Sequence, residues 1–466
     1  MILNQDIFRG FSIRGVVGKD LDAETMTLIG HGIGTWFNSK GGNTLVVGHD
    51  VRKSSPNLHK SLIKGLMQAG IEIFDIGLTP TPVLNFATDF YRASGGIMLT
   101  ASHNPGEYNG IKIRSERTVF GDDLKKIYTI IQEKKFTQAI GQYKKVDPLE
   151  SYLNAVSMGI NLKKSLRVVV DGGNGANGLI VPDLLRDLGC HVDEIFCETD
   201  GNFPNRDPDP TALNATKYLA DEVLRLNADL GLAFDGDGDR VIFVDEKGQT
   251  HFGDITLMLL ARDVLIRQKV KVVYEVLCSQ AVADDIEAHG GQAIAAPSGY
   301  AFVHEKMLES GAVLGGEMSG HLFILDHQFK FDDAILASVR LVALLASKQS
   351  SLSELVAELP KYFASREIRL TCEDWVKGQI VDSVAEWFAN KYPVDRIDGA
   401  RILFSDGWAI VRQSNTQPVI SLRFETKTSM GRLQEIAFEV LDALQQQFIE
   451  RDILFPFDIS NLKDHL

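Results

Sequence analysis

Three carboxylates alternate with glycines in one short segment, Asp235-Gly-Asp-Gly-Asp239, and Arg240 follows directly. Carboxylates at every second position can converge on one hard cation, and without a cation their mutual repulsion would be destabilising. Three single-oxygen ligands suit Mg²⁺, which usually shares its coordination sphere with water or a phosphate. An EF-hand is the alternative, because Glu246 would be its twelfth residue, but its sixth position requires Gly and is Arg240. We therefore predict a Mg²⁺ site at Asp235, Asp237 and Asp239, beside an arginine suited to grip a phosphoryl group.

A second polar segment, Thr100 to Lys112, is rich in reactive side chains. Ser102 is a hydroxyl nucleophile, His103 beside it is a candidate proton carrier, and Lys112 supplies a cation. The alternative is a plain polar loop with a Pro-Gly turn. The density of chemical groups favours a catalytic loop centred on Ser102.

Two further loops carry groups that bind sugars or phosphates. Gly315 to His321 contains Glu317 and Ser319 between glycines, a mixture of acceptors and donors that suits sugar hydroxyls. Arg412 to Pro418 combines one arginine with several small polar side chains between two predicted strands, which is the composition of a phosphate cradle. A tight turn and a plain hairpin loop are the respective alternatives.

The glycines Gly173, Gly175 and Gly178 have the spacing of a dinucleotide-binding motif, and they follow a predicted strand. In such a motif the third glycine lies within the packing of the helix on the strand. Here Pro182 places the start of the helix beyond Gly178. A nicotinamide-dependent oxidoreductase is therefore an alternative but not the favoured function.

The composition is that of an ordinary folded protein. The chain has 466 residues, of which 44% are hydrophobic and 24% are charged, so disorder, collagen and a coiled coil are poor descriptions. Asp and Glu number 62 against 48 Lys and Arg, and the net charge is −14. This balance opposes binding to nucleic acid or to an anionic membrane, so we expect neither as a partner. Any phosphate site must be a local cluster of cations.

The four cysteines are sparse, and the amino terminus lacks the basic and apolar regions of a signal peptide. No apolar run approaches the ~20 residues that a membrane helix needs. We therefore expect reduced thiols and a cytoplasmic protein.

The elements that position the polar loops recur along the chain. A strand, a helix, a glycine and a second strand are predicted three times, within residues 44–76, 166–196 and 270–294. This pattern predicts three similar α/β domains with mixed sheets, whose functional loops follow the strands. The last hundred residues instead predict a smaller α+β domain, with strands at 400–404, 408–412 and 419–425 and a helix at 433–448.

Polar stretches near residues 145, 249 and 365 predict the boundaries of these domains. The first domain would be 1–145 with the Ser102 loop, and the second 146–249 with the metal-binding loop. The third would be 250–365 with the sugar-binding loop, and the last 366–466 with the phosphate-binding loop.

Together these segments resemble the α-D-phosphohexomutase superfamily, in particular its bacterial phosphomannomutase/phosphoglucomutase branch. The resemblance covers essentially the whole chain and rests on segments in the family's order and spacing: Phe8 to Gly15, Thr100 to Lys112, Asp235 to Arg240, Gly316 to His321 and Arg412 to Pro418. It implies four domains around a central cleft. It also implies an intramolecular phosphotransferase that interconverts hexose 1-phosphate and hexose 6-phosphate, with mannose or glucose as the sugar.

The resemblance implies a role for each site residue. Ser102 would carry the phosphoryl group and bind Mg²⁺ together with Asp235, Asp237 and Asp239, and hexose 1,6-bisphosphate would be the intermediate and activator. Arg14, Lys112 and Arg240 would stabilise charge on the transferred group, and His321 or Lys112 would carry the proton. The implied ligands of the sugar phosphate are Glu317 and Ser319 for the hydroxyls, and Arg412, Ser414, Asn415 and Thr416 for the phosphate that is not transferred.

The main departures from the family pattern lie in the third predicted domain. Leu277 stands where Lys is usual, and Tyr300 stands where His is usual and would offer the sugar an aromatic face. His304 and Lys306 are the candidates for a compensating charge. We therefore predict weaker use of mannose and glucose phosphates than is usual in this branch, and a non-catalytic phosphosugar-binding protein is an alternative. The preferred sugar stays open, and we expect a monomer or a weak homo-oligomer.

Overall fold

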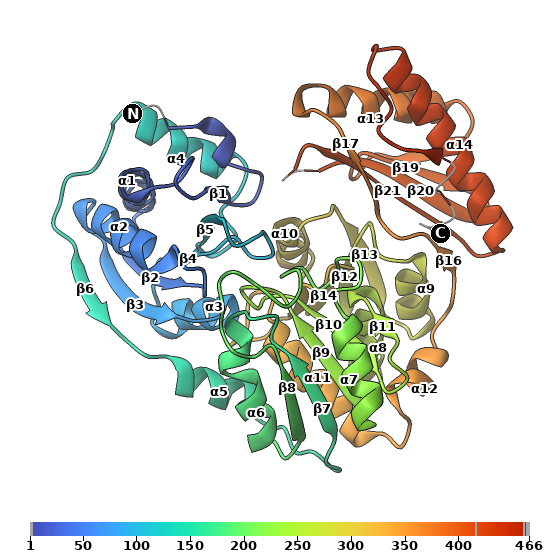
Figure 1. Ribbon diagram of the computed structural model, residues 1–466, viewed down its shortest axis with the longest axis horizontal. Coiled ribbons are helices and arrows are strands. Elements are labelled where there is room, and N and C mark those ends of the chain that lie inside the picture. The colour runs from blue at the N-terminus through green and yellow to red at the C-terminus, as the bar shows by residue number, and fades with distance from the viewer. Residues whose placement is uncertain (1–2, 415–416, 460–461, 463–466) are drawn as a thin grey trace.

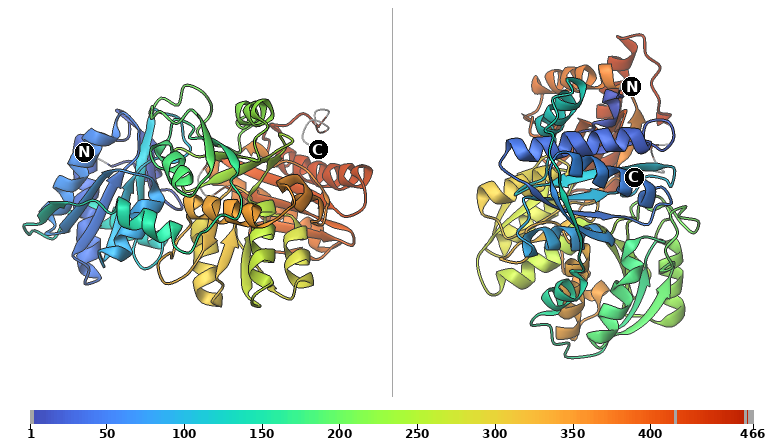
Figure 2. Two further views of the ribbon diagram at one scale, coloured as in Figure 1. Left: turned by 90° about the horizontal axis from the view of Figure 1, so that it is seen from below. Right: turned by 90° about the vertical axis from the view of Figure 1, so that its left-hand side faces the viewer.

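A computed structural model of the chain describes residues 3–414, 417–459 and 462 (Figure 1). These residues form four sheets, one after another along the chain. We call each sheet with its helices a domain, numbered I to IV from the amino terminus. In the left panel of Figure 2, domain I lies at one end of the molecule, domain IV at the other, and domains II and III between them.

Domain I has a sheet in the order β1-β5-β4-β2-β3-β6, in which only β1 and β5 run antiparallel to their neighbours. Its strands are β1 (Ile13–Val16), β2 (Thr44–His49), β3 (Glu72–Leu78), β4 (Gly95–Leu99), β5 (Tyr108–Arg114) and β6 (Gln142–Lys145). Its helices are η1 (Gln5–Ile7), α1 (Ala23–Ser39), α2 (Ser55–Gln68), α3 (Thr81–Phe90) and α4 (Asp122–Gln132).

Domain II has the order β11-β10-β9-β7-β8, with β9, β7 and β8 parallel. Its strands are β7 (Arg167–Asp171), β8 (His191–Ile195), β9 (Leu230–Phe234), β10 (Val241–Asp245) and β11 (Thr250–His251). Its helices are α5 (Leu149–Ser157), η2 (Ala176–Leu179), α6 (Val181–Asp187) and α7 (Lys217–Leu226).

Domain III has the order β13-β12-β14-β15, with only β15 antiparallel. Its strands are β12 (Lys271–Glu275), β13 (Gln292–Ala296), β14 (Leu314–Gly316) and β15 (Leu322–Ile324). Its helices are α8 (Gly253–Leu265), α9 (Gln280–Ala288), α10 (Tyr300–Ser310), α11 (Ala334–Ser347) and α12 (Leu352–Ala357).

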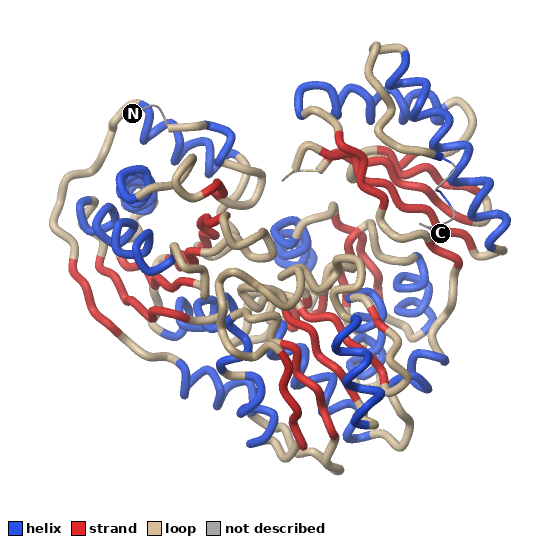
Figure 3. The backbone as a smooth tube through the Cα atoms, viewed as in Figure 1, coloured by secondary structure: helices blue, strands red, loops and turns tan. Residues whose placement is uncertain are grey.

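Domain IV is an antiparallel sheet in the order β16-β21-β20-β19-β18, and β17 also pairs with β21. Its strands are β16 (Phe363–Ala364), β17 (Ile368–Thr371), β18 (Val394–Asp395), β19 (Ala400–Phe404), β20 (Gly407–Gln413) and β21 (Val419–Thr426). Helices α13 (Asp374–Ala389) and α14 (Met430–Ile449) share one apolar core with this sheet (Figure 3).

Domains I, II and III repeat one topology. In each, a central strand pairs in parallel with the next strand on one side and with the one after that on the other. A short loop then leads from this third strand to an antiparallel fourth strand. The three equivalent loops are residues 100–107, 235–240 and 317–321. Each begins at the carboxyl end of a parallel strand, where α/β proteins bind ligands.

The cores show how the domains are joined. One apolar cluster spans domains II and III and includes Val83 and Phe86 of α3, so domain I is docked on this central body through α3. Domain IV has its own core and meets domain III through Leu277, Trp408 and Ile410. The body formed by domains II and III therefore positions both outer domains.

The predicted α/β architecture with a final α+β domain is confirmed. The strands predicted at 400–404, 408–412 and 419–425 correspond to β19, β20 and β21, whereas α13 was not predicted. None of the helices built from the described residues is long and apolar enough to cross a membrane.

Candidate active site

The three equivalent loops of domains I, II and III meet at one place. Ser102 Oγ in the domain I loop donates a hydrogen bond of 3.0 Å to Asp235 Oδ2 in the domain II loop. A backbone bridge joins Arg240 of the domain II loop to His321 of the domain III loop. Residues that the sequence placed in three separate segments therefore form one site.

Ser102 is held in an uncommon backbone conformation. It is buried and has φ of +51°, in the left-handed region that residues other than glycine rarely adopt. Its N–H donates a hydrogen bond of 2.8 Å to Thr100 Oγ1, and its Oγ lies 3.2 Å from Nδ1 of His103. The hydroxyl is thereby directed at the carboxylates of domain II.

Arg52 holds this loop in place, although the sequence analysis did not identify it. Its side chain is fully buried and pairs with Asp50 at 3.0 Å. Its two terminal nitrogens donate hydrogen bonds of 2.5 to 3.0 Å to the backbone carbonyls of Ser102, Asn104, Pro105 and Tyr108. Arg52 follows β2 at the carboxyl edge of the sheet, and that position was the available signal in the sequence.

The three carboxylates of the domain II loop fit a cation. Asp235, Asp237 and Asp239 are buried, and one oxygen of each lies within 4.8 Å of the others. Among the described residues, none donates a hydrogen bond to Oδ1 of Asp237 or Oδ1 of Asp239. Buried carboxylate oxygens are normally paired, so this donor set suits a metal ion. Gly238 has φ of +80°, and a Cβ atom there would lie 2.2 Å from Asn177 Oδ1, so the loop requires glycine at this turn.

Lys112 is a fixed cation at the edge of the carboxylates. Its Nζ donates to Asp237 Oδ2 at 2.7 Å and to Asp239 Oδ2 at 2.5 Å. Burial disfavours the ammonium, but these two carboxylates outweigh it and raise the pKa of Lys112 above its ordinary value. Burial, followed by the charge of Asp237, raises the pKa of Asp239. The cluster therefore retains Lys112 in its charged form.

Two arginines direct donors into the same site. Arg240 Nε donates to Asp235 Oδ2 at 3.1 Å and Nη1 to Asp209 Oδ1 at 3.3 Å, while its Nη2 has no acceptor among the described residues. Arg14 Nη1 donates to Asn104 Oδ1 at 2.7 Å, and its buried Nε likewise has no acceptor within the described parts of the chain. These free N–H groups suit the oxygens of a phosphoryl group.

His321 forms a pair with Asp332, which the sequence analysis missed. His321 Nδ1 lies 2.6 Å from Asp332 Oδ2 and 3.8 Å from Asp239 Oδ1. Burial disfavours the charged ring, but Asp239 and Asp332 outweigh it and raise the pKa of His321 to about 9. A carboxylate on one ring nitrogen orients the ring and leaves Nε2 for proton transfer.

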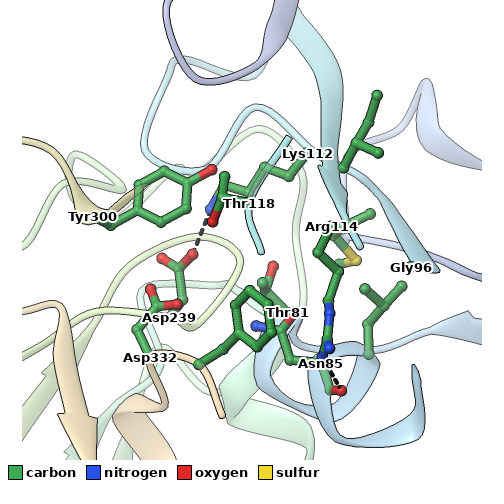
Figure 4. A pocket seen from close by; sticks show the side chains of 13 residues that line it. Thr81, Asn85, Gly96, Lys112, Arg114, Thr118, Asp239, Tyr300 and Asp332 are labelled. Atoms are coloured by element: carbon green, nitrogen blue, oxygen red, sulfur yellow. Dashed lines mark hydrogen bonds and ion pairs between the residues drawn. The ribbon is translucent and has the colours of Figure 1, made fainter. Parts of the chain in front are cut away.

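Tyr300 lies against these groups from domain III. Its ring stacks on that of His321 with centroids 5.2 Å apart, and Lys112 Nζ is 5.8 Å from its centroid. Figure 4 shows Tyr300 and Lys112 beside Asp239 and Asp332 in a pocket lined by domains I, II and III. The sequence-predicted Tyr300 is therefore part of the site.

The predicted sugar loop is held by its own carboxylate. Glu317 is buried, and its two oxygens accept hydrogen bonds from Gly299 N–H at 2.8 Å and from Ser319 Oγ at 2.9 Å. Glu275 lies beside it, and burial, followed by the charge of Glu317, raises the pKa of Glu275 to about 8. The loop therefore presents Glu317 and Ser319 together.

The predicted phosphate loop connects β20 and β21 of domain IV. Arg412 is buried, and its Nε donates a hydrogen bond of 2.7 Å to Asp398 Oδ2. Lys377 Nζ donates to the backbone carbonyl of Ser414 at 2.6 Å. The predicted Asn415 and Thr416 lie outside the described residues.

Comparison with known proteins agrees with this geometry. The chain matches four models described as phosphoglucomutase/phosphomannomutase: alpha/beta/alpha domain I at residues 5–138, domain II at 149–248, domain III at 252–363 and the C-terminal domain at 351–443. The chain belongs to the phosphoglucomutase/phosphomannomutase family.

Relatives match the chain over nearly its full length. A phosphomannomutase/phosphoglucomutase of Pseudomonas putida is 40% identical and covers 98% of this chain and 98% of its own. The Pseudomonas aeruginosa protein of the same name is 39% identical, covering 91% and 93%. A solved phosphoglucomutase/phosphomannomutase family protein from Burkholderia thailandensis has a TM-score of 0.90 at 34% identity, covering 98% and 100%. The chain is therefore a phosphohexomutase-type enzyme.

The departures from the family pattern in domain III have different consequences. Leu277 is buried in the apolar contact with Trp408 and Ile410 of domain IV. His304 is also buried, and the centroids of its ring and the Phe331 ring are 4.3 Å apart. Lys306 Nζ lies on the surface, 3.2 Å from Glu309 Oε2. The expectation that His304 or Lys306 supplies a compensating charge was wrong, because α10 turns both side chains to other partners.

The glycines that imitate a dinucleotide motif support the metal-binding loop of this family member. The N–H of Ala176 donates to the carbonyl of Gly236 at 3.2 Å, and Asn177 Nδ2 donates to the carbonyl of Gly238 at 3.1 Å. A Cβ atom on Gly178 would lie 2.2 Å from the carbonyl oxygen of Cys197. This backbone packs against other parts of the protein, whereas the backbone of a dinucleotide motif approaches its ligand. The structure therefore does not support the oxidoreductase alternative.

Proposed function

We propose that this enzyme interconverts the 1- and 6-phosphates of a hexose, mannose or glucose, through phosphorylated Ser102 and a hexose 1,6-bisphosphate that turns over within the site. The observation that carries the proposal is the Ser102 hydroxyl, buried and 3.0 Å from a cluster of three carboxylates with unpaired oxygens. The Ser102 Oγ–P bond would break as a sugar hydroxyl oxygen forms its own bond to phosphorus, with the proton of that hydroxyl passing to a proton carrier and Ser102 Oγ regaining a proton. In the second half the sugar O–P bond of the other phosphate would break as Ser102 Oγ bonds to that phosphorus, which restores the phosphoserine and frees the isomeric hexose phosphate.

The proposed cation is Mg²⁺, held by Asp235, Asp237, Asp239 and an oxygen on Ser102. Bound there, it would supply positive charge that offsets the charge of the phosphoserine, which is about −1.5 to −2 at neutral pH. Arg14, Lys112 and Arg240 lie around the same point and would stabilise the transferred group. Phosphoryl transfer depends chiefly on such positioning and electrostatics.

We assign the proton carrier to His321. Lys112 has both adjacent carboxylates as partners, which supports a role as a cation. His321 instead has one ring nitrogen on Asp332, and its other ring nitrogen has no hydrogen-bond partner among the described residues. His321→Asn is then expected to lose turnover while the Ser102 phosphate remains in intact mass. If the variant instead lacks the phosphate on Ser102, His321 is needed to keep Ser102 phosphorylated, and the assignment as proton carrier is overturned.

The remaining loops would bind the sugar phosphate. Glu317, Ser319 and the face of Tyr300 would contact the sugar, while Arg412, Ser414, Asn415 and Thr416 would hold the phosphate that is not transferred. Reduced activity with mannose and glucose phosphates stays a prediction. A turnover assay across mannose, glucose and glucosamine phosphates, with a catalytic amount of hexose bisphosphate, would identify the preferred sugar.

The serine assignment has a direct test. Ser102→Ala is expected to abolish turnover and to remove a phosphate that is detectable by intact mass in the natural protein. Ser115→Ala is the matched control, because Ser115 is only partly buried and its hydroxyl bonds only the nearby Arg117 carbonyl among described partners. Substantial activity in Ser102→Ala would refute the assignment. A natural protein with no turnover on any of these sugars would favour the non-catalytic alternative.

Two further expectations stay predictions. A cytoplasmic location is to be checked by cell fractionation, and a monomer or weak homo-oligomer by light scattering.

A further inference from the structure

Asp398 joins domain IV to domain III through one carboxylate oxygen. Its Oδ2 accepts a hydrogen bond of 2.7 Å from Arg412 Nε within domain IV and one of 2.9 Å from the Ser298 N–H in domain III. Only 11% of its side chain is exposed. The next residue, Gly399, has φ of +75°, and a Cβ atom there would lie 2.5 Å from the carbonyl oxygen of Val411. This close approach of the turn to β20 sets Asp398 beside Arg412.

The domain III side of this contact is a short segment that touches three domains. Ser298 bonds Asp398 of domain IV, and the Gly299 N–H donates to Glu317 Oε1 within domain III at 2.8 Å. Tyr300 OH donates to the carbonyl of Phe11 in domain I at 3.4 Å. A displacement of Ser298 therefore affects the support of Glu317.

We propose that Asp398 is a positioning residue that couples recognition of the phosphate in domain IV to recognition of the sugar in domain III. Arg412 and the Ser298 N–H both donate hydrogen bonds to Asp398, and the N–H of the next residue, Gly299, donates to Glu317. These contacts form a continuous path from Arg412 to Glu317. This inference rests on the phosphate role of Arg412 and the sugar role of Glu317 proposed above. Asp398 itself would touch neither substrate nor metal.

The first test is steady-state kinetics of Asp398→Asn with a hexose 1-phosphate. Asparagine has nearly the same shape but no charge, and hydrogen bonds between charged groups are the strong ones, so KM is expected to rise about tenfold to hundredfold. The phosphate is bound in both ground and transition states, so kcat should change by less than about threefold. Asp395→Asn is the matched control, since Asp395 is an exposed carboxylate near this turn that bonds the Ile397 N–H.

Two companion variants separate the possible failures. If Arg412→Ala raises KM and Asp398→Asn does not, the positioning role is overturned while the proposed function stands. If Arg412→Ala leaves KM unchanged, Arg412 does not bind the phosphate as proposed, and this inference is overturned as well. Asp398→Glu keeps the charge and is expected to raise KM by less than Asp398→Asn; a wild-type KM in every folded variant overturns the proposal.

The coupling between domains is tested by a double-mutant cycle of Asp398→Asn and Glu317→Gln. Residues without shared partners give independent effects, so their factors on kcat/KM multiply. Because Ser298 and Gly299 connect these two carboxylates, we expect the double variant to depart from the product by more than about threefold. Effects that simply multiply would overturn the coupling.

Discussion

Ser102 has a backbone conformation that its own side chain does not favour. A residue other than glycine in the left-handed region costs on the order of 1 kcal/mol or more, so neighbouring groups must hold it there. Arg52 does so with its side chain fully buried and its guanidinium donating hydrogen bonds to four backbone carbonyls of the loop region. The Ser102 hydroxyl is therefore positioned by a residue to which we assign no part in the proposed reaction.

Arg52→Lys should impair both stability and turnover. An ammonium keeps the charge but lacks the planar fork that reaches several acceptors, so buried carbonyls would be left unpaired at about 1 to 3 kcal/mol each. We expect a lower melting temperature and a loss of activity of at least about tenfold, measured by thermal melting and turnover. Arg92→Lys is a control, because Arg92 is exposed after α3. Wild-type activity in Arg52→Lys would contradict the positioning role.

Asp237→Asn should separate activity from stability. Asp237 is one of three adjacent buried carboxylates, so removing one charge weakens the cation site and also relieves repulsion. Lys112 keeps Asp239 as a partner, and the Thr81 hydroxyl can still donate to the remaining oxygen. We expect loss of most activity with little change in melting temperature. A collapse of the fold on chelation of the wild-type protein would instead make the metal-binding loop structural.

At the scale of elements, equivalent connections of three repeated sheets supply Ser102, the three carboxylates, and Glu317 with Ser319. Each connection leaves a parallel strand at its carboxyl end, which is why residues far apart in sequence can meet. The contact between domains III and IV is built differently, from apolar side chains around Leu277 and Trp408.

Leu277→Lys should weaken this contact. The substitution would place an ammonium among Trp408 and Ile410, and burial of an unpaired charge is costly, so we expect a loss of at least about 2 kcal/mol. Tryptophan fluorescence in urea would report it, because three of the four tryptophans lie in domain IV. Leu277→Met, which conserves volume, should cost less than about 1.5 kcal/mol. Equal urea midpoints for Leu277→Lys and Leu277→Met would show that residue 277 is not packed in the contact between domains III and IV.

For the molecule as a whole, His304 makes stability depend on pH. Burial lowers the pKa of His304 to about 4, from an ordinary value of about 6.5. Above pH ~6.5 the ring is neutral in both states. Between pH values of about 6.5 and 4 only the unfolded chain takes up the proton. The free energy of unfolding therefore decreases as the pH is lowered through this range, by roughly 3 kcal/mol in total.

His304→Phe should remove this part of the pH dependence, because phenylalanine does not titrate and the neighbouring rings can accommodate it. We expect its melting temperature to fall less than that of the wild type between pH 6.5 and 4. His327→Phe, at an exposed turn, is the control. Parallel pH curves for wild type and His304→Phe would show that the buried ring does not contribute.

Several of the site residues and much of the fold could be predicted because they leave local signals. Strands and helices of the three βαβ repeats follow from short-range hydrophobic periodicity, and the metal-binding loop follows from three carboxylates within five residues. Helix α13 escaped prediction, although it packs on β19 and β20. Its apolar positions include Val376, Ile380 and Val384, so a local signal for this helix is present in the sequence.

The sequence by itself determined the α/β class and the order of the four polar loops, and it predicted the chemistry of Ser102, the three aspartates and Arg412. Only the tertiary structure identified Arg52, Asp332 and Asp398, because their roles depend on contacts with residues distant along the chain. It also decided that Leu277 packs between domains while Tyr300 lies at the site. The physical reason is that a side chain's type is local information, whereas the partner it meets is set by how the sheets pack.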